Sequence, residues 1–189
     1  DKKDLVERGA KEPARSSRDE IASFLGKARE LAEARAGSGE RGRLIFALDA
    51  TMSRQPTWDS ACQLQADMFH RTAQIGGLDV QLVYFRGFGE CRASKWVGNP
   101  DRLAELMTAI SVRGGHTQIA KVLAHARKEA ARGRVHALVY VGDCMEEDVD
   151  RLCAHAGELG LLHVPLFMFQ EGHDMLAERA FKEMSRLSG

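Results

Sequence analysis

A carboxylate and two hydroxyl groups stand at alternate positions in the stretch RLIFALDATMSRQ, residues 43–55. They belong to Asp49, Thr51 and Ser53, which directly follow an apolar run. Side chains two residues apart in an extended segment lie on the same side, so the three oxygen donors can converge. Such donors suit a hard cation such as Mg²⁺. Asp49 and Ser53 also fit a cap for the following helix, and the segment alone supports both interpretations equally.

Two further polar residues follow at comparable places later in the chain. Thr117 ends a glycine-rich loop within GGHTQ, and Asp143 follows an apolar strand within YVGDC. Ligands of open α/β sheets bind beyond the carboxyl ends of the strands, near the point where the strand order reverses. If the strands before Asp49 and Asp143 are neighbours, we expect their ends and the Thr117 loop to meet there.

The elements that must position these residues alternate between strands and helices. This alternation predicts a doubly wound, mostly parallel α/β sheet of five strands with helices on both faces. A short turn makes the third strand antiparallel to the second, and Pro165 places the last strand at an edge because proline cannot donate to the ladder. The predicted spatial order, 3-2-1-4-5, is 90–97, 79–85, 43–48, 134–141 and 162–169.

Periodic apolar residues predict helices between these strands and at both ends of the chain. We divide the chain into a flexible leader at 1–16, an amphipathic helix and linker at 17–42, and the main domain at 43–189. The apolar stripe of the first helix must dock on the main domain or on a partner. The last helix, 173–188, is expected to bury Leu176, Ala180, Met184 and Leu187.

Composition excludes several classes of function. The 27 basic and 27 acidic residues balance and are scattered, so no basic stripe suited to nucleic acid is present. No apolar run is long enough for a membrane span or a signal core, which predicts a cytoplasmic protein. The cysteines form no CxxC pair, so we expect them to be reduced and mostly buried, and we expect no zinc site. The four are Cys62, Cys91, Cys144 and Cys153.

Taken together, the three motifs resemble the metal-ion-dependent adhesion site of von Willebrand factor A-type (VWA) domains, which combines DxSxS with a distant Thr and a distant Asp. Here the elements are Asp49-Ala50-Thr51-Met52-Ser53, Thr117 and Asp143, in that order. Thr51 replaces the usual serine but keeps the hydroxyl. Cys144 stands where many members have glycine. The resemblance covers about residues 43–188 and is typical of intracellular bacterial members.

The resemblance implies a binding module rather than an enzyme. Thr51 and Ser53 would coordinate Mg²⁺, or Mn²⁺ or Ca²⁺, directly; Thr117 would do so in one state, and Asp49 and Asp143 would act largely through waters. A protein partner would supply an Asp or Glu to the open position, and members of this kind often act as adaptors for AAA+ ATPases. His116 and Trp58 are candidate contact residues, although an exposed loop histidine and a packed tryptophan are the simpler interpretations.

Two alternatives remain at the level of the sequence. One is a Mg²⁺-dependent phosphatase or phosphotransferase with Asp49 as nucleophile; such enzymes commonly carry a second Asp two residues on, where this chain has Thr51. The other is a structural module without a metal. Nucleotide binding is disfavoured because neither GxGxxG nor GxxxxGK[ST] occurs.

Overall fold

The computed structural model describes residues 15–33, 38–75 and 77–189. The predicted leader at 1–16 lies outside them except for its last two residues, as does Gly37, which we expected to end the first helix. The strands are β1 Gly42–Asp49, β2 Leu78–Arg86, β3 Glu90–Ala93, β4 Ala137–Gly142 and β5 Leu166–Gln170. The helices are α1 Arg15–Glu33, α2 Trp58–Ile75, α3 Pro100–Thr108, α4 Ile119–Arg132, α5 Val149–Leu161 and α6 Met175–Ser188, with a 3₁₀ turn, η1, at Met52–Thr57.

The five strands form one sheet in the order β3-β2-β1-β4-β5, and only β3 is antiparallel to its neighbour. The fold class and strand order predicted from the sequence are therefore confirmed. Three strands are shorter than expected. Leu162 and His163 instead terminate α5, and β5 begins one residue after Pro165, so the proline precedes the edge strand rather than lying within it.

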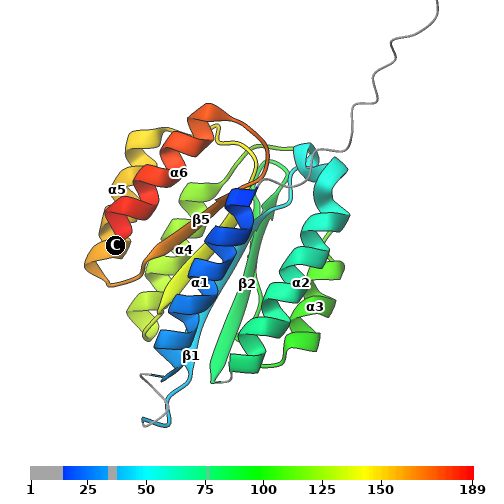
Figure 1. The fold of residues 1–189 in the computed structure, drawn as a ribbon. Helices are drawn as coiled ribbons and strands as arrows, with labels where there is room; N and C mark the ends of the chain where they lie inside the picture. The colour runs from blue at the N-terminus through cyan, green and yellow to red at the C-terminus, as the bar shows by residue number, and fades with distance from the viewer. Residues whose placement is uncertain (1–14, 34–37, 76) are drawn as a thin grey trace, which may run out of the picture.

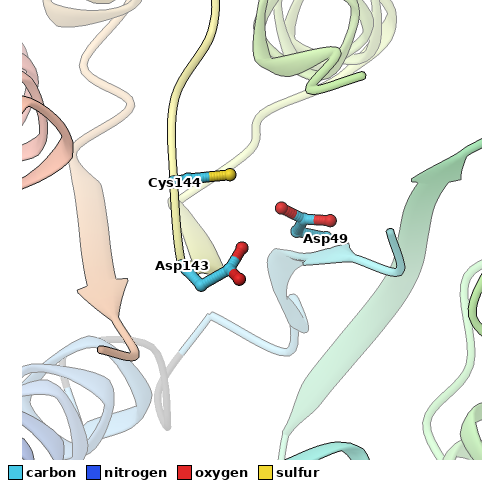
Figure 2. Close-up of side chains that lie close together, drawn as sticks. All are labelled: Asp49, Asp143 and Cys144. Carbon is cyan, nitrogen blue, oxygen red and sulfur yellow. The ribbon is translucent and has the colours of Figure 1, made fainter. Parts of the chain in front are cut away.

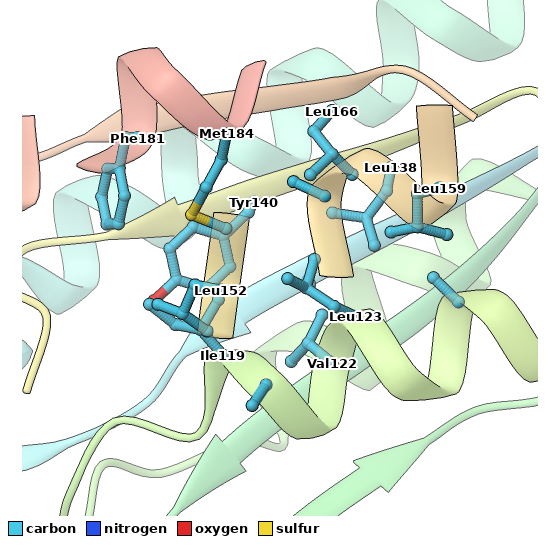
Figure 3. Packing of buried hydrophobic residues seen from close by; sticks show 14 of the residues in the cluster. Ile119, Val122, Leu123, Leu138, Tyr140, Leu152, Leu159, Leu166, Phe181 and Met184 are labelled. Atoms are coloured by element: carbon cyan, nitrogen blue, oxygen red, sulfur yellow. The ribbon is translucent and has the colours of Figure 1, made fainter. Parts of the chain in front are cut away.

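Helices cover both faces of the sheet, as Figure 1 shows. Alternation along β1 sends Leu44, Phe46 and Leu48 to one face and Ile45 and Ala47 to the other, and all five are buried. The first face packs against α1, α2 and α3, whereas α4, α5 and α6 pack against the second. Figure 3 shows the second core, in which Tyr140 lies among apolar side chains from α4, α5 and α6.

The first helix docks on the main domain. Phe24 and Ala28 of α1 are buried, and the Phe24 ring packs edge-on against Phe167 of β5 with centroids 5.3 Å apart. The apolar stripe of α1 was expected to dock either on the main domain or on a partner, and these residues dock on the main domain.

The buried stripe of α6 differs from the predicted one. Leu176 is 65% exposed, while Ala177 and Phe181 are buried beside Ala180 and Met184. The buried set has the helical spacing i, i+3, i+4, i+7, and Leu176 lies one position outside it. The Asp174 side chain caps the helix by accepting from the Ala177 amide. The four cysteines are free as expected, but all are partly exposed rather than buried.

The loop before α4 is held against the β2–β3 turn. The His116 amide donates to the Gly87 carbonyl at 3.2 Å, and a Cβ added at Gly115 would lie only 1.8 Å from that carbonyl oxygen. A Cβ on the neighbouring Gly114 would meet nothing within 4 Å. Glycine at position 115 therefore permits the close approach that sets the path of the chain into Thr117.

We expect Gly115→Ala to destabilise the domain by about 1–3 kcal/mol, because the methyl group must displace backbone rather than a side chain. Gly114→Ala is the matched control and should change stability little. Chemical denaturation of both variants measures the difference. Equal stability of the two variants would contradict the contact between the turn and the loop.

Candidate metal-binding site

The candidate site lies where the strand order reverses. β1 and β4 are parallel neighbours, and Leu48 pairs with Val141, so Asp49 and Asp143 leave adjacent strand ends. The helix after β1 covers one face and the helix after β4 covers the other. Crevices of this kind bind ligands in open α/β sheets. The sheet therefore brings together the two carboxylates that the sequence placed 94 positions apart.

Asp49, Asp143 and Cys144 form a compact donor group. One carboxylate oxygen of each aspartate and the Cys144 sulfur all lie within 4.8 Å of one another. Figure 2 shows the side chains of Asp143 and Cys144 reaching from the end of β4 toward the Asp49 carboxylate. In the sequence, Cys144 stands where many VWA members have glycine, and no role was predicted for it.

The hydroxyl groups of the first motif lie beside Asp49. Its Oδ1 accepts hydrogen bonds from the Thr51 amide at 2.8 Å and the Thr51 hydroxyl at 2.6 Å. The Thr51 hydroxyl is in turn 3.2 Å from the Ser53 hydroxyl. Asp49 and Thr51 are buried, whereas Ser53 is exposed at the surface. The three side chains therefore lie close together, although the cause is not alternation alone: Ser53 belongs to the 3₁₀ turn η1, which brings its hydroxyl back beside Thr51.

Thr117 lies in the loop before α4 and contacts the loop that follows β4. Its hydroxyl accepts from the Glu146 amide at 3.0 Å, and its own amide donates to the Glu146 carboxylate. Glu147 accepts from the amides of Ile119 and Ala120 at the start of α4. The loop that carries Asp143 is therefore fastened to the Thr117 segment, and in the described residues the Thr117 hydroxyl bonds to Glu146 rather than to either aspartate.

The acids after Asp143 serve two helices. Acidic residues just before a helix are usually favoured there by the dipole of that helix. Asp148 does cap α5, by accepting from the Arg151 amide, but Glu146 and Glu147 serve α4 instead. Sequence periodicity gives no signal for such a contact between separate helices.

A buried arginine that sequence reasoning missed lies beneath the site. The Arg54 side chain is completely buried and donates to the backbone carbonyls of Asp49 and Val141, at 3.3 and 3.2 Å. It also pairs with Glu171 at 3.1 Å. Arg54 thus ties together the ends of β1 and β4 and the residue after β5. Its proximity to Ser53 in the chain was the available signal.

The two candidate contact residues, Trp58 and His116, both make contacts within the domain. Trp58 is buried, and the Arg54 guanidinium lies 5.6 Å from its ring centroid, which supports the packing interpretation. His116 is exposed, 3.0 Å from the Glu146 carboxylate, and its ring packs edge-on against Phe88 with centroids 5.0 Å apart.

Two carboxylate oxygens without hydrogen-bond partners indicate that the donor set fits a cation. In the described part of the chain, Asp49 Oδ2 and Asp143 Oδ1 are buried without a hydrogen-bond partner. Burial is the main cause that raises the pKa of Asp49 to about 6, and the charge of Asp143 adds to it, against the hydrogen bonds from Thr51 and the weaker effect of Arg54. Unpaired buried carboxylates are costly, and a cation between them would remove that cost.

Cys144 is not poised as a nucleophile in this arrangement. Burial, followed by the charges of Asp143 and Asp49, raises the pKa of its thiol to about 12. Because the thiolate is the reactive form, the thiol is inert near neutral pH without a bound cation.

Comparisons by sequence give no match, either to a family model or to a curated protein. Among solved structures, the chain is similar to the SpRpn10 VWA domain, with a TM-score of 0.62, 12% identity, and coverage of 79% of this chain and 82% of that one. A match to the three N-terminal domains of the type V pili tip protein Mfa5 from Porphyromonas gingivalis covers 55% of this chain and 20% of that one, at 15% identity and a TM-score of 0.44, and supports no argument. The chain has the VWA-type fold, as its motifs predicted.

The raised pKa of Asp49 predicts the pH dependence of stability in the presence of a chelator. The folded state holds the proton of the Asp49 carboxyl group more tightly than the unfolded chain does. The contribution of Asp49 to stability is therefore largest below pH 4 and falls as the pH rises from about 4 to 6. The shift corresponds to about 3 kcal/mol. Urea denaturation of the wild type and Asp49→Asn between pH 4 and 7 measures this contribution.

Asp49→Asn keeps the Oδ1 acceptor for Thr51 but removes the charge. We expect it to be more stable than the wild type at pH 7 and to lack that part of the pH dependence. Asp143→Asn should lower the midpoint of the fall, because it removes the neighbouring charge. An Asp49→Asn variant less stable than the wild type at pH 7 without metal would contradict this electrostatic account.

Proposed function

We propose that the chain is a metal-dependent protein-binding module, in which a divalent cation held at the ends of β1 and β4 accepts an Asp or Glu carboxylate from a protein partner. The observation that supports it is that Asp49 and Asp143 each have a buried oxygen without a hydrogen-bond partner in the described residues, while their carboxylates lie within 4.8 Å of each other and the Thr51 and Ser53 hydroxyls lie beside Asp49. Thr117 completes the proposed ligand set. Mg²⁺ is the expected ion, with Mn²⁺ or Ca²⁺ as substitutes.

Arg54 does not neutralise the two carboxylates, so the proposed site has room for the charge of a bound cation. The guanidinium is engaged by Glu171 and by two strand-end carbonyls, and it lowers the pKa of Asp49 less than the hydrogen bonds from Thr51 do. When bound, the metal would supply the positive charge between the carboxylates and an electrophilic position for the partner. The hydroxyl ligands are neutral, so the ion would keep its attraction for an incoming carboxylate.

Exposed apolar side chains around the site favour a protein as the partner. Met52, Phe88, Met175 and Leu176 are 52%, 81%, 74% and 65% exposed, and we call them the apolar rim. Met52 lies between two proposed ligands, Phe88 follows β2, and the other two open α6 after β5. Because β1, β2 and β5 run in the same direction, all four residues lie toward the carboxyl ends of the strands, where the site lies. Apolar anchors around a polar centre are typical of protein interfaces.

The finer identity of the partner rests on the resemblance stated above. An AAA+ ATPase or another member of a multiprotein assembly is the class of partner that it suggests, and a cytoplasmic location belongs to the same proposal. Among the described helices, none combines the length and apolarity needed to cross a bilayer.

The arrangement gives little support to a phosphate-transfer enzyme. Asp49 is fully buried, and one of its oxygens already accepts two hydrogen bonds from Thr51. A carboxylate nucleophile must instead approach phosphorus directly, with an acid or base nearby. We therefore propose no catalytic residue. Stable phosphorylation of Asp49 would overturn the binding-module proposal.

Titration with Mg²⁺ or Mn²⁺ tests the metal site. We expect one site in the wild type and at least tenfold weaker binding in Asp49→Ala, Ser53→Ala and Asp143→Ala, with a smaller loss in Thr117→Ala. Because protons compete for Asp49, Mg²⁺ should raise the melting temperature more at pH 7.5 than at pH 5. Calorimetry and thermal unfolding measure these effects. Binding that is unchanged in Asp49→Ala would contradict the site.

The apolar rim gives a second test, because a substitution there should weaken partner binding without changing metal binding. Phe88→Ala should weaken partner binding at least tenfold while leaving Mn²⁺ affinity unchanged, because the ring anchors the interface without touching the ion. Leu161→Ala is the control. Leu161 is 83% exposed, but it lies at the end of α5 that is far from the carboxyl ends of the strands and from the site. The measurement is retention of protein partners on the immobilised domain, followed by elution with chelator. Retention that resists chelation would refute the mechanism for that partner.

A further inference from the structure

Cys144 places a sulfur donor beside the proposed cation position. Its Sγ is within 4.8 Å of the donor oxygens of both Asp49 and Asp143, and Figure 2 shows it directed toward the Asp49 carboxylate. Asp49 supplies an independent sign of a ligand, because it is fully buried, its Oδ2 has no hydrogen-bond partner in the described residues, and its carboxylate belongs to the same donor group. A thiol and two carboxylates thus converge on one point.

This spacing fits a tetrahedral ion with only small side-chain adjustments. With metal–oxygen and metal–sulfur distances of about 2.0 and 2.3 Å, tetrahedral ligand atoms lie roughly 3.3–3.5 Å apart. The observed limit of 4.8 Å exceeds this by about the reach of one side-chain rotation. Three protein donors with a fourth position left open is also the pattern of zinc sites that accept an outside ligand.

The third donor also changes which ion the site prefers. Oxygen donors alone suit Mg²⁺, whereas a thiolate favours softer ions such as Zn²⁺ and Cd²⁺. Glycine at the position after the aspartate would leave an all-oxygen site. The expectation of no zinc site came from the lack of paired Cys or His residues, and a single Cys adjacent to an Asp carries no such signature.

We propose that the site has a second mode of binding, in which Asp49, Asp143 and Cys144 together ligate a thiophilic divalent ion such as Zn²⁺ and exclude Mg²⁺. The inference rests on the proposed function, since both modes use the same two carboxylates. On binding, the thiol proton passes to solvent and the sulfur bonds to the metal. Thiophilic ions would then compete with Mg²⁺ for the module, and the fourth position would remain open to a carboxylate.

Cd²⁺ alone is the probe for this mode, because a cadmium–thiolate bond gives an ultraviolet charge-transfer band. One equivalent of Cd²⁺ added to the reduced protein should produce the band in the wild type and in Cys153→Ser, but not in Cys144→Ser. Bound Mn²⁺, followed by electron paramagnetic resonance in the same samples, should be displaced by Cd²⁺. We expect Cys144→Ser to weaken Cd²⁺ binding at least tenfold while leaving Mn²⁺ affinity within about twofold.

The outcomes separate this inference from the proposed function. If Mn²⁺ binds but Cd²⁺ gives no band, or if the band persists in Cys144→Ser, the thiolate mode is wrong and the adhesion-site proposal stands. If the band appears and depends on Cys144 while Mn²⁺ fails to bind, the thiolate mode stands and the proposed function fails. Binding of neither ion in the folded protein overturns both.

Discussion

The structure depends on two carboxylates that are forced together where water cannot fully solvate them. Asp49 and Asp143 leave adjacent parallel strands, and each has a buried oxygen without a partner in the described residues. Burial outweighs the hydrogen bonds from Thr51, so the pKa of Asp49 rises to about 6. Folding alone does not favour such an arrangement. A bound cation would favour it, and local instability of this kind is typical of functional sites.

The surrounding contacts hold this arrangement in place without neutralising it. Arg54 is the nearest buried cation on the described chain, but Glu171 and the carbonyls of two strand ends engage it. Glu146 and Glu147 likewise use their carboxylates on the Thr117 segment and the start of α4. The scaffold therefore fixes the positions of the ligands and leaves the charge of the site for an ion to balance. Cys144 adds a sulfur donor beside the two carboxylates, and in the proposed thiolate mode it would change which ion the site prefers.

Local sequence patterns predicted most of the fold because they reflect local physics. Continuous apolar runs gave the buried strands, and Pro165 correctly placed β5 at an edge, although the strand itself begins at Leu166. The stripe of α6 was misassigned because Leu176 and Ala177 both fit a helical repeat with Ala180 and Met184, and only packing shows that the face with Ala177 and Phe181 is the buried one. Asp49, Thr51 and Ser53 were expected to lie together through alternation in an extended segment, but Ser53 belongs to the 3₁₀ turn η1. Arg54, Glu146, Glu147 and Cys144 act through contacts between distant segments, for which one sequence carries no periodic signal.

The central claim is that a divalent ion occupies the space between Asp49 and Asp143. An anomalous difference map from crystals of the domain grown with Mn²⁺ tests it most directly. The account predicts one strong peak at the carboxyl ends of β1 and β4, close to Asp49 Oδ2, Asp143 Oδ1 and the Thr51 and Ser53 hydroxyls, and its loss in Asp49→Ala. An ordered, metal-free pair that shares a proton at saturating Mn²⁺, or a peak elsewhere on the domain, would contradict the account.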